Sequence, residues 1–257
     1  MSNATDQKTY GLFSTAANRK LIDKLESSGA KVFQFPPIET EKVILDEHSI
    51  SYLQNLTDFD WLIFPDVFAV DYFLQALEEL SVDFFEMDAV NVCAIGEAVA
   101  DRLRFVQLHA DLIPNFVETE SVLTTILNYT NQNGLENLRF LLPKEFDSEI
   151  ELTEKLTENK TIVTEFPIYQ ARFTDKRKVS KLKALLNGGA IDEFIFSSPT
   201  DIIALKYLFS GNAMSEILAE IEMSATDEVM FQALKEHNLK PKIYRTEADA
   251  KQPFLTC

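Results

Sequence analysis

The stretch Glu165–Gln170, with the sequence EFPIYQ, has a near copy earlier in the chain at Gln34–Glu39, with the sequence QFPPIE. Phe35 and Phe166 are 131 positions apart. The same spacing relates other apolar residues on either side: Val32 and Val163, Leu25 and Leu156, Leu103 and Leu234. A fixed spacing that holds across most of a chain indicates an internal duplication. The sequence therefore predicts two related halves, each with one Phe-Pro segment.

Apolar runs typical of strands alternate along both halves with segments that have the spacing of amphipathic helices. Asp60–Phe64 and Asp192–Phe196 are nearly continuous apolar runs, which is typical of strands covered on both faces. The alternation predicts parallel sheets flanked by helices in right-handed crossovers. We predict strands at 9–14, 31–35, 60–64, 90–95, 110–113, 138–142, 161–165, 192–196, 221–224 and 241–244. We predict helices at 18–28, 47–56, 67–80, 97–105, 118–129, 148–157, 178–186, 200–209 and 228–237.

The prolines of the two Phe-Pro segments bear on how the halves are connected. Pro36 and Pro37 have no backbone N–H, so the strand at 31–35 cannot continue its pairing through them. The halves could be consecutive domains, or each segment could carry the chain from one domain to the other. Phe-Pro segments that stop pairing with their own sheet favour this second arrangement, in which each segment carries the chain from one domain to the other.

The composition is typical of a soluble globular protein, with 46% hydrophobic and 25% charged residues in 257 positions. The net charge of −17 argues against binding to nucleic acid or to anionic membranes, since both require a basic face. No apolar run approaches the ~20 residues of a membrane span. The polar N-terminus, residues 1–8, does not resemble a signal peptide, and we expect a cytoplasmic protein.

The cysteines and histidines do not have the spacing of a metal site or of a disulfide framework. Cys93 lies in an apolar run, and Cys257 is the last residue. The histidines, His48, His109 and His237, are far apart and have no other ligand type at a suitable spacing. We therefore expect no bound metal.

In parallel sheets flanked by helices, ligands bind at the carboxyl ends of the strands, where loops lead into helices. These loops are the candidate site before any family is considered. They are Ser14–Thr15, Pro65–Asp66, Gly96–Glu97, Pro143–Lys144, Ser197–Thr200 and Thr226–Asp227.

Four segments together resemble the uroporphyrinogen-III synthase family. Phe59–Phe64 (FDWLIF) resembles the family's middle strand, and Val92–Gly96 (VCAIG) resembles the strand and turn that follow it. Phe196–Thr200 (FSSPT) resembles a segment of the second half, and Ile168–Gln170 (IYQ) resembles the segment with the family's catalytic tyrosine. The resemblance runs from about Thr9 to Tyr244 in the right order.

The resemblance implies the second arrangement of the halves. The expected fold is α/β and internally duplicated, with two three-layer, parallel-sheet domains joined by a two-stranded linker. One domain would comprise residues 1–34 and 174–257, and the other residues 42–162. The linker would comprise residues 35–41 and 163–173, and the active site would lie in the cleft between the domains.

The resemblance also implies an enzyme, a lyase of tetrapyrrole biosynthesis. Family members need no cofactor. They convert hydroxymethylbilane, a linear tetrapyrrole with eight carboxylates, into cyclic uroporphyrinogen III and invert the terminal pyrrole ring. We expect this small molecule as the substrate, and we expect a monomer with neither nucleic acid nor membrane as a partner.

Tyr169 matches the family's tyrosine, and its neutral phenol could assist departure of the substrate hydroxyl. The alternative is that Tyr169 only packs against the linker. Helix N-termini could hold the substrate's carboxylates. The candidate substrate-binding residues are Ser14, Thr15, Asp66, Gly96, Lys144, Ser197, Ser198 and Thr200. One of the three hydroxyls after the strand at 192–196 could instead be an ordinary helix cap.

The sequence departs from the family pattern at three of these loops. Pro65–Phe68 places a carboxylate where the family has hydroxyls, and Asp66 would repel substrate carboxylates unless protonated or turned away. Ser14–Ala16 lacks the family's arginine, and Ala225–Val229 lacks its glycine and hydroxyl.

The departures keep other classes of function open. The chain could be a catalytically inactive relative that binds a tetrapyrrole or a protein partner. A phosphoacceptor receiver is disfavoured because Ser14 and Thr15 cannot supply its Mg²⁺ ligands. A periplasmic sugar-binding protein is disfavoured because no signal peptide is recognised.

Overall fold

The computed structural model describes residues 8–130, 134–148, 151–209 and 220–245. The chain divides into two compact units. The terminal unit combines Met1–Ile38 with Phe173–Cys257, and the middle unit is Glu39–Arg172. Each unit contains one five-stranded sheet.

The sheet of the terminal unit has the strand order β10-β9-β8-β1-β2, and all four strand pairs are parallel. Its strands are β1 (Thr9–Phe13), β2 (Lys31–Phe35), β8 (Glu193–Phe196), β9 (Glu222–Ala225) and β10 (Pro241–Ile243). Its helices are α1 (Arg19–Ser27), α7 (Lys176–Asn187), α8 (Pro199–Leu208) and α10 (Glu228–Glu236).

Alternate side chains of these strands pack against helices on both faces of the sheet. Phe194 and Phe196 pack in one core with residues of α7, α8 and α10. Leu12 and Ile195 pack on the other face with Ile22 of α1. This alternation is the reason why strands such as β8 are apolar at nearly every position.

The sheet of the middle unit has the strand order β3-β7-β6-β4-β5. Its strands are β3 (Ile38–Lys42), β4 (Trp61–Phe64), β5 (Asn91–Ala94), β6 (Arg139–Glu145) and β7 (Ile162–Phe173). Its α-helices are α2 (Glu47–Gln54), α3 (Val67–Glu79), α4 (Glu97–Phe105), α5 (Thr119–Tyr129) and α6 (Glu151–Glu158). Two 3₁₀ helices, η1 (Leu56–Asp58) and η2 (Phe84–Ala89), precede β4 and β5.

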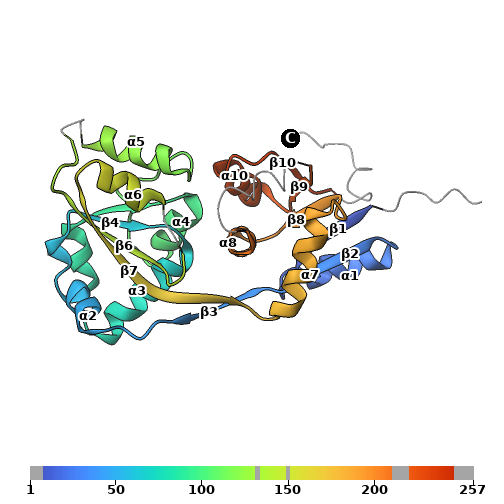
Figure 1. The fold of residues 1–257 in the computed structure, drawn as a ribbon, viewed down its shortest axis with the longest axis horizontal. Helices are drawn as coiled ribbons and strands as arrows, with labels where there is room; N and C mark the ends of the chain where they lie inside the picture. Colours follow the sequence, from blue (N-terminus) through green and yellow to red (C-terminus); the bar gives the residue numbers. More distant parts are fainter. Residues whose placement is uncertain (1–7, 131–133, 149–150, 210–219, 246–257) are drawn as a thin grey trace, which may run out of the picture. The chain divides into compact units, whose positions relative to one another are not determined.

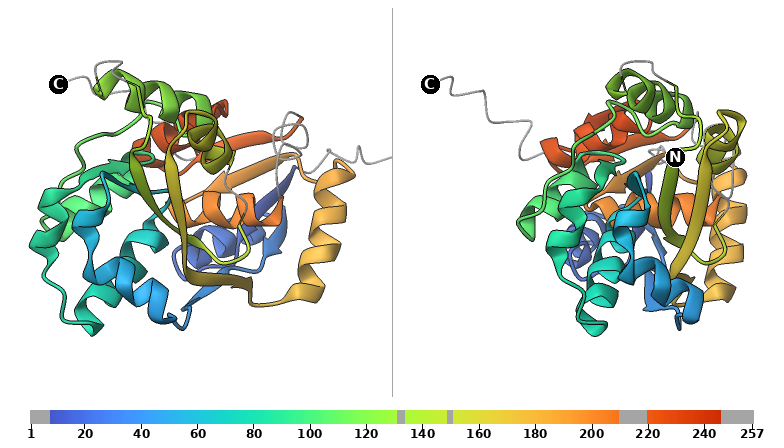
Figure 2. Two further views of the ribbon diagram at one scale, coloured as in Figure 1. Left: turned by 60° about the vertical axis from the view of Figure 1, so that its left-hand side comes forward. Right: turned by 90° about the vertical axis from the view of Figure 1, so that its left-hand side faces the viewer.

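The middle unit also has three layers. Leu62 and Phe64 of β4 pack with α2, α3 and α4, while Trp61 and Ile63 pack with α5 and α6 on the other face. Figure 1 shows α5 and α6 together on one side of this sheet, and Figure 2 shows the same layers from two further directions. The parallel α/β fold predicted from the sequence is confirmed.

The second Phe-Pro segment differs from the prediction. We predicted a strand that ends at Glu165 and a proline that stops the pairing, but β7 continues through Pro167 to Phe173. It pairs with β6 as far as Tyr169. Proline lacks one hydrogen-bond donor but can adopt an extended backbone, so β7 can still run beside the long strand β6. The first segment behaves as predicted, because β2 ends at Phe35.

Two smaller differences concern short elements. The strand predicted at 110–113 is a single parallel bridge between Cys93 and Leu112. The other is η2, which lies between α3 and β5 and was not predicted from the sequence.

The two sheets share a strand order. When β7, β6, β4 and β5 are matched to β2, β1, β8 and β9, the first residues of matched strands lie 130 to 132 positions apart. A duplication predicts this agreement, and the duplication itself stays a prediction. Within the part of the chain that the structure describes, no helix is long and apolar enough to span a membrane.

Candidate functional site

A β-bulge in β7 determines the direction of the Tyr169 side chain. The register of β6 and β7 shifts between Lys144 and Glu145, and Glu145 pairs with Tyr169, which leaves Ile168 as the extra residue. An extra residue re-aims the side chains that follow it. Tyr169 therefore joins Phe166 in the core beside α3.

The Tyr169 hydroxyl donates a hydrogen bond to Asp66, with 2.7 Å between the phenol oxygen and Oδ2. Asp66 follows β4 and is the N-cap residue of α3, so its Oδ1 accepts from the backbone N–H of Ala69 at 2.9 Å. The two bonds fix the carboxylate at a helix N-terminus, where the helix dipole favours a negative charge.

Tyr169 is enclosed by aromatic neighbours and is only 1% exposed. Its ring stacks on Tyr72 at a centroid distance of 5.6 Å and contacts Phe68 at 5.7 Å. Burial raises the pKa of the Tyr169 phenol far above its ordinary value, and the neighbouring Asp66 carboxylate raises that pKa further. The phenol is therefore neutral at physiological pH, and its proton lies on the hydrogen bond to Asp66.

Gly96 occupies the next helix N-terminus along the same edge of the sheet. It follows β5, which pairs with β4, and is the N-cap residue of α4. Its backbone has φ 95° and ψ 154°, a conformation that is essentially restricted to glycine. Asp66 and Gly96 therefore begin two helices that follow neighbouring parallel strands.

Glu145, which was not among the residues predicted from the sequence, is a buried carboxylate beside Tyr169. Its Oε1 accepts from the Ala171 backbone N–H at 3.1 Å, and its Oε2 accepts from the Asp147 N–H at 2.8 Å. Burial raises the pKa of Glu145 despite these bonds. Its position directly after Lys144, at the end of a buried strand, is the signal that could have identified it.

Lys144 forms an ion pair with Glu165, with 2.7 Å between Nζ and Oε2. The Lys144 side chain is 8% exposed, and Glu165 also accepts from the Thr153 hydroxyl of α6. Lys144 thus lies on the α6 side of the sheet, and Tyr169 lies on the α3 side. The structure does not bring these two candidates together, and a substrate-binding role for Lys144 stays a prediction.

In the terminal unit, Ser14 and Thr15 directly follow β1. The Ser14 backbone N–H donates to the Phe35 carbonyl at 2.7 Å. The Thr15 hydroxyl oxygen accepts from the Asn18 backbone N–H at 3.2 Å. Both residues form part of the turn that leads into α1.

Ser197, Ser198 and Thr200 follow β8, the strand beside β1. Ser198 is the N-cap residue of α8, and its Oγ accepts from the Thr200 backbone N–H at 3.1 Å. The Ser198 and Thr200 hydroxyls also bond to each other. The structure thus confirms that one of these hydroxyls caps the helix.

Asp201 and Asn18 form a buried polar contact beneath these loops. Asp201 is 1% exposed, and its Oδ2 accepts from the backbone N–H and the hydroxyl of Ser197. Burial raises the pKa of Asp201, while hydrogen bonds from Ser197, Ser198 and Asn18 oppose that change. Asn18 also donates to the Phe13 carbonyl at 2.9 Å, so it ties the end of β1 to the start of α8.

The predicted site residues other than Lys144 therefore fall into two groups. Asp66 and Tyr169 are in direct contact in the middle unit, and Gly96 lies at the adjacent helix start. The other group, in the terminal unit, consists of the hydroxyls after β1 and β8. It comprises Ser14, Thr15, Ser197, Ser198 and Thr200.

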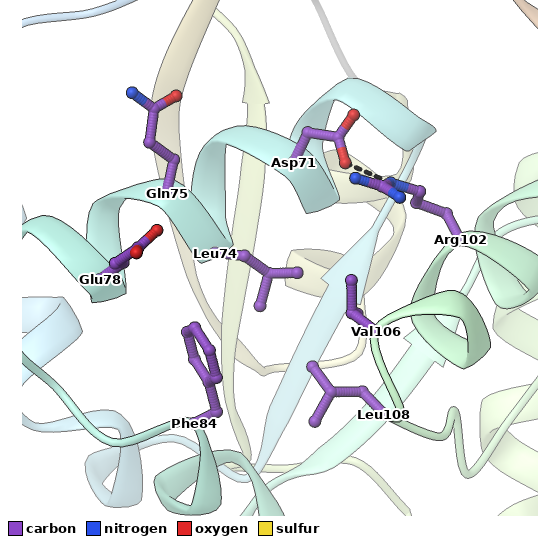
Figure 3. A pocket seen from close by; sticks show the side chains of 8 residues that line it. All are labelled: Asp71, Leu74, Gln75, Glu78, Phe84, Arg102, Val106 and Leu108. Carbon is purple, nitrogen blue, oxygen red and sulfur yellow. Dashed lines mark hydrogen bonds and ion pairs between the residues drawn. The ribbon is translucent and has the colours of Figure 1, made fainter.

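A pocket of about 260 Å³ lies elsewhere in the middle unit, between α3, α4 and η2 (Figure 3). Leu74, Phe84, Val106 and Leu108 supply its apolar lining, and the ion pair between Asp71 and Arg102 lies at its edge. None of the predicted site residues lines it. Among the residues that the structure describes, no group of three or more His, Cys, Asp or Glu side chains is arranged to hold a metal ion.

Comparisons with known proteins relate the chain to one family. The family model described as uroporphyrinogen-III synthase HemD matches residues 19–253. The porphyrin biosynthesis protein HemD of Ruminiclostridium josui is 19% identical over 182 residues, which are 71% of this chain and 35% of that protein. The chain thus spans about a third of the length of this curated relative.

Solved structures support the same relation at the level of the fold. Uroporphyrinogen III synthase of Thermus thermophilus is 20% identical, with a TM-score of 0.62 over 91% of this chain and 92% of that one. A mutant uroporphyrinogen III synthase from the same organism gives a TM-score of 0.61 over 93% of both chains, at 20% identity. Since the family model matches nearly the whole sequence, the chain belongs to the uroporphyrinogen-III synthase family.

Proposed function

We propose that the chain is a uroporphyrinogen-III synthase. The reaction closes hydroxymethylbilane into uroporphyrinogen III with inversion of the terminal pyrrole ring, releases water and uses no cofactor. The observation that carries the proposal is the family match over residues 19–253. The structural similarity to the Thermus thermophilus enzymes, at 20% identity, supports the fold, and the activity is what the experiment below tests.

The contact between Tyr169 and Asp66 supports a catalytic use of this part of the middle unit. The resemblance assigns proton donation to the tyrosine, and the phenol is held neutral and hydrogen-bonded to Asp66. We therefore assign the departure of the substrate hydroxyl to the pair and not to Tyr169 alone. A fixed pair also costs no reorganisation when charge develops in the transition state.

Backbone N–H groups at helix starts are the proposed partners of the substrate carboxylates. The start of α4 at Gly96 has no side chain to obstruct an anion. The same role is proposed for the hydroxyls of Ser14, Thr15, Ser197, Ser198 and Thr200. Donors of this kind suit a protein with a net charge of −17, because they need no cluster of lysines.

The test is conversion of pre-formed hydroxymethylbilane by the purified chain. Hydroxymethylbilane closes spontaneously to the uninverted type I isomer, so the type III isomer reports the enzyme. Chromatography of the oxidised products should give type III as the main isomer, at a rate proportional to protein. A product mixture identical to that of the protein-free sample would refute the proposal.

A second candidate is a catalytically inactive relative that binds a tetrapyrrole or a protein partner. The observation that favours it is the carboxylate of Asp66 at a loop where the family pattern has hydroxyls. Binding of hydroxymethylbilane without formation of the type III isomer would support this candidate.

We also propose that the protein is cytoplasmic and monomeric. Cell fractionation tests the location, and light scattering tests the oligomeric state.

A further inference from the structure

We propose that Asp66 is the side chain of this pair that contacts the reacting pyrrole ring, and that Tyr169 is a positioning residue that acts through Asp66. The inference rests on the proposed function and specifies how its site operates. It concerns a residue at which the sequence departs from the family pattern.

The first observation is the burial of Tyr169. The residue is 1% exposed, and its ring lies against Tyr72 and Phe68. Its single hydroxyl proton is donated to Asp66 at 2.7 Å. In this arrangement a substrate cannot reach the phenol, and the phenol has no second proton to donate.

The second observation is the position of Asp66. It is partly exposed, whereas β4, which precedes it, is buried throughout. It lies at the carboxyl end of a central parallel strand and begins α3, which is where ligands bind in sheets of this type. The Ala69 N–H and the Tyr169 hydroxyl hold its two oxygens, so its direction is fixed.

The third observation concerns the protonation of Tyr169. Burial and the Asp66 charge both raise the pKa of this phenol. Donation of its proton to the substrate would leave a tyrosinate in an apolar core beside a carboxylate, which both effects oppose. Tyr169 is therefore suited to hold Asp66 in place and unsuited to act as the acid.

The chemistry of the first step gives Asp66 a role as an anion. When the substrate hydroxyl departs, the carbon–oxygen bond breaks and both electrons stay with the oxygen, which takes a proton from solvent and leaves as water. The methylene carbon and its pyrrole ring remain as an azafulvenium cation, with the charge spread to the ring N–H. A carboxylate at that N–H stabilises the cation more than the neutral ring, which lowers the barrier.

The same charge opposes binding of the substrate, which carries eight carboxylates. Replacing Asp66 by a neutral residue should therefore ease binding while it slows the chemical step. This opposite effect on KM and kcat separates a catalytic carboxylate from a structural one, since loss of structure would not improve binding.

The experiment compares variants of the full chain in the isomer assay. Asp66→Asn removes the charge and keeps a good N-cap residue. Asp66→Ser, also a neutral cap, serves if the first variant is unstable. Asp46→Asn is the matched control, because Asp46 caps α2 in the middle unit through a 2.8 Å bond from the Ser49 N–H. Thermal melting establishes that each variant is folded.

Asp66→Asn should lower kcat at least about tenfold, while KM stays equal or falls. Tyr169→Phe should lower kcat by a smaller factor, about 2- to 5-fold, since Asp66 remains but is less well held. The double variant should fall within about twofold of Asp66→Asn, because Tyr169 acts through the residue already removed. Asp46→Asn should match the wild type.

Three results would overturn the inference. Equal kcat values for Asp66→Asn and Asp46→Asn would exclude a role for the Asp66 charge. The phenol would be shown to act directly if Tyr169→Phe lowered kcat by as large a factor as Asp66→Asn or a larger one, and if the double variant lowered kcat by the product of the two factors. A wild-type chain that forms no type III isomer would refute the proposed function, and the inference with it.

Discussion

Tyr169 and Asp66 are separated by 103 positions in the sequence and are joined by one hydrogen bond in the structure. The resemblance to the family selected Tyr169, and the loop after the strand at 60–64 selected Asp66, but nothing in the residue spacing indicated that they touch. Their contact depends on the bulge at Ile168, which a pattern of apolar residues does not encode. Lys144 was predicted to lie in a loop after the strand at 138–142, but β6 continues to Glu145, and the Lys144 side chain lies on the α6 side of the sheet.

The ion pair of Lys144 and Glu165 gives a prediction at the scale of single residues. Glu165→Gln should destabilise the fold by about 1–2 kcal/mol, because an ammonium that is 8% exposed loses its charged partner. The value is below the ~3–5 kcal/mol expected for a fully buried pair, since Glu165 is 35% exposed and solvent screens part of its charge. Urea unfolding measures the change.

The double variant Lys144→Met/Glu165→Gln is the control, because it leaves no unpaired charge in the sheet. It should be more stable than Glu165→Gln alone. If the double variant were the less stable of the two, the unpaired lysine could not be the cause of the loss.

Among the secondary-structure elements, those with strong local patterns were predicted well. α4 was predicted at 97–105 and observed at Glu97–Phe105, and β2 was predicted and observed at Lys31–Phe35. The error at β7 arose because the strand was predicted to end at Glu165, before the second Phe-Pro segment, whereas β7 runs to Phe173. The length of its partner, β6, is a property of the sheet that no single segment reveals.

The start of α4 gives a prediction at the scale of an element. Gly96→Ala should destabilise the middle unit by about 1–3 kcal/mol, since φ 95° with ψ 154° is essentially confined to glycine. Gly189→Ala is a suitable control. Gly189 has φ 65° and open space around an added Cβ, so Gly189→Ala should destabilise the fold by only about 1 kcal/mol. Equal losses in the two variants would mean that the turn before α4 has no special requirement for glycine.

The ion pairs of Glu222 on β9 predict a contribution to stability that depends on pH in the acid range. Glu222 pairs with Lys242 at 2.7 Å and also with Lys8. The hydrogen bond from Lys242, followed by that from Lys8, lowers the pKa of Glu222 to about 2. A carboxyl whose pKa is lower in the folded state stabilises the fold above its unfolded pKa, and that contribution is lost as the pH falls.

Unfolding of the wild type and of Glu222→Gln should therefore be compared between pH 7 and pH 2. The wild type should be the more stable of the two at pH 7, and the difference should shrink below about pH 4.5. It should also shrink in high salt, because Glu222 is half exposed. A difference that stayed constant over this pH range would show that the charge of Glu222 does not stabilise the fold.

For the whole molecule, the division into units predicts different folding behaviour. The middle unit is one continuous segment, Glu39–Arg172, whereas the terminal unit needs both ends of the chain. The only tryptophan of the chain, Trp61, is 1% exposed in the middle unit and stacks on Phe140 at 6.1 Å. Trp fluorescence therefore reports the middle unit alone.

A fragment of residues 39–172 should fold on its own, because it holds β4, β5, β6 and β7 with their helices. It should show the blue-shifted emission of a buried tryptophan and a cooperative urea transition. The emission of a solvent-exposed tryptophan in the fragment would show that the middle unit depends on the terminal one.

The measurement that tests the central claim most directly is the ratio of isomers formed from hydroxymethylbilane at increasing concentrations of the wild-type chain. Our account predicts that the type III fraction rises with protein from the spontaneous background to nearly all of the product. A type III fraction that stays at the background at every protein concentration would contradict it.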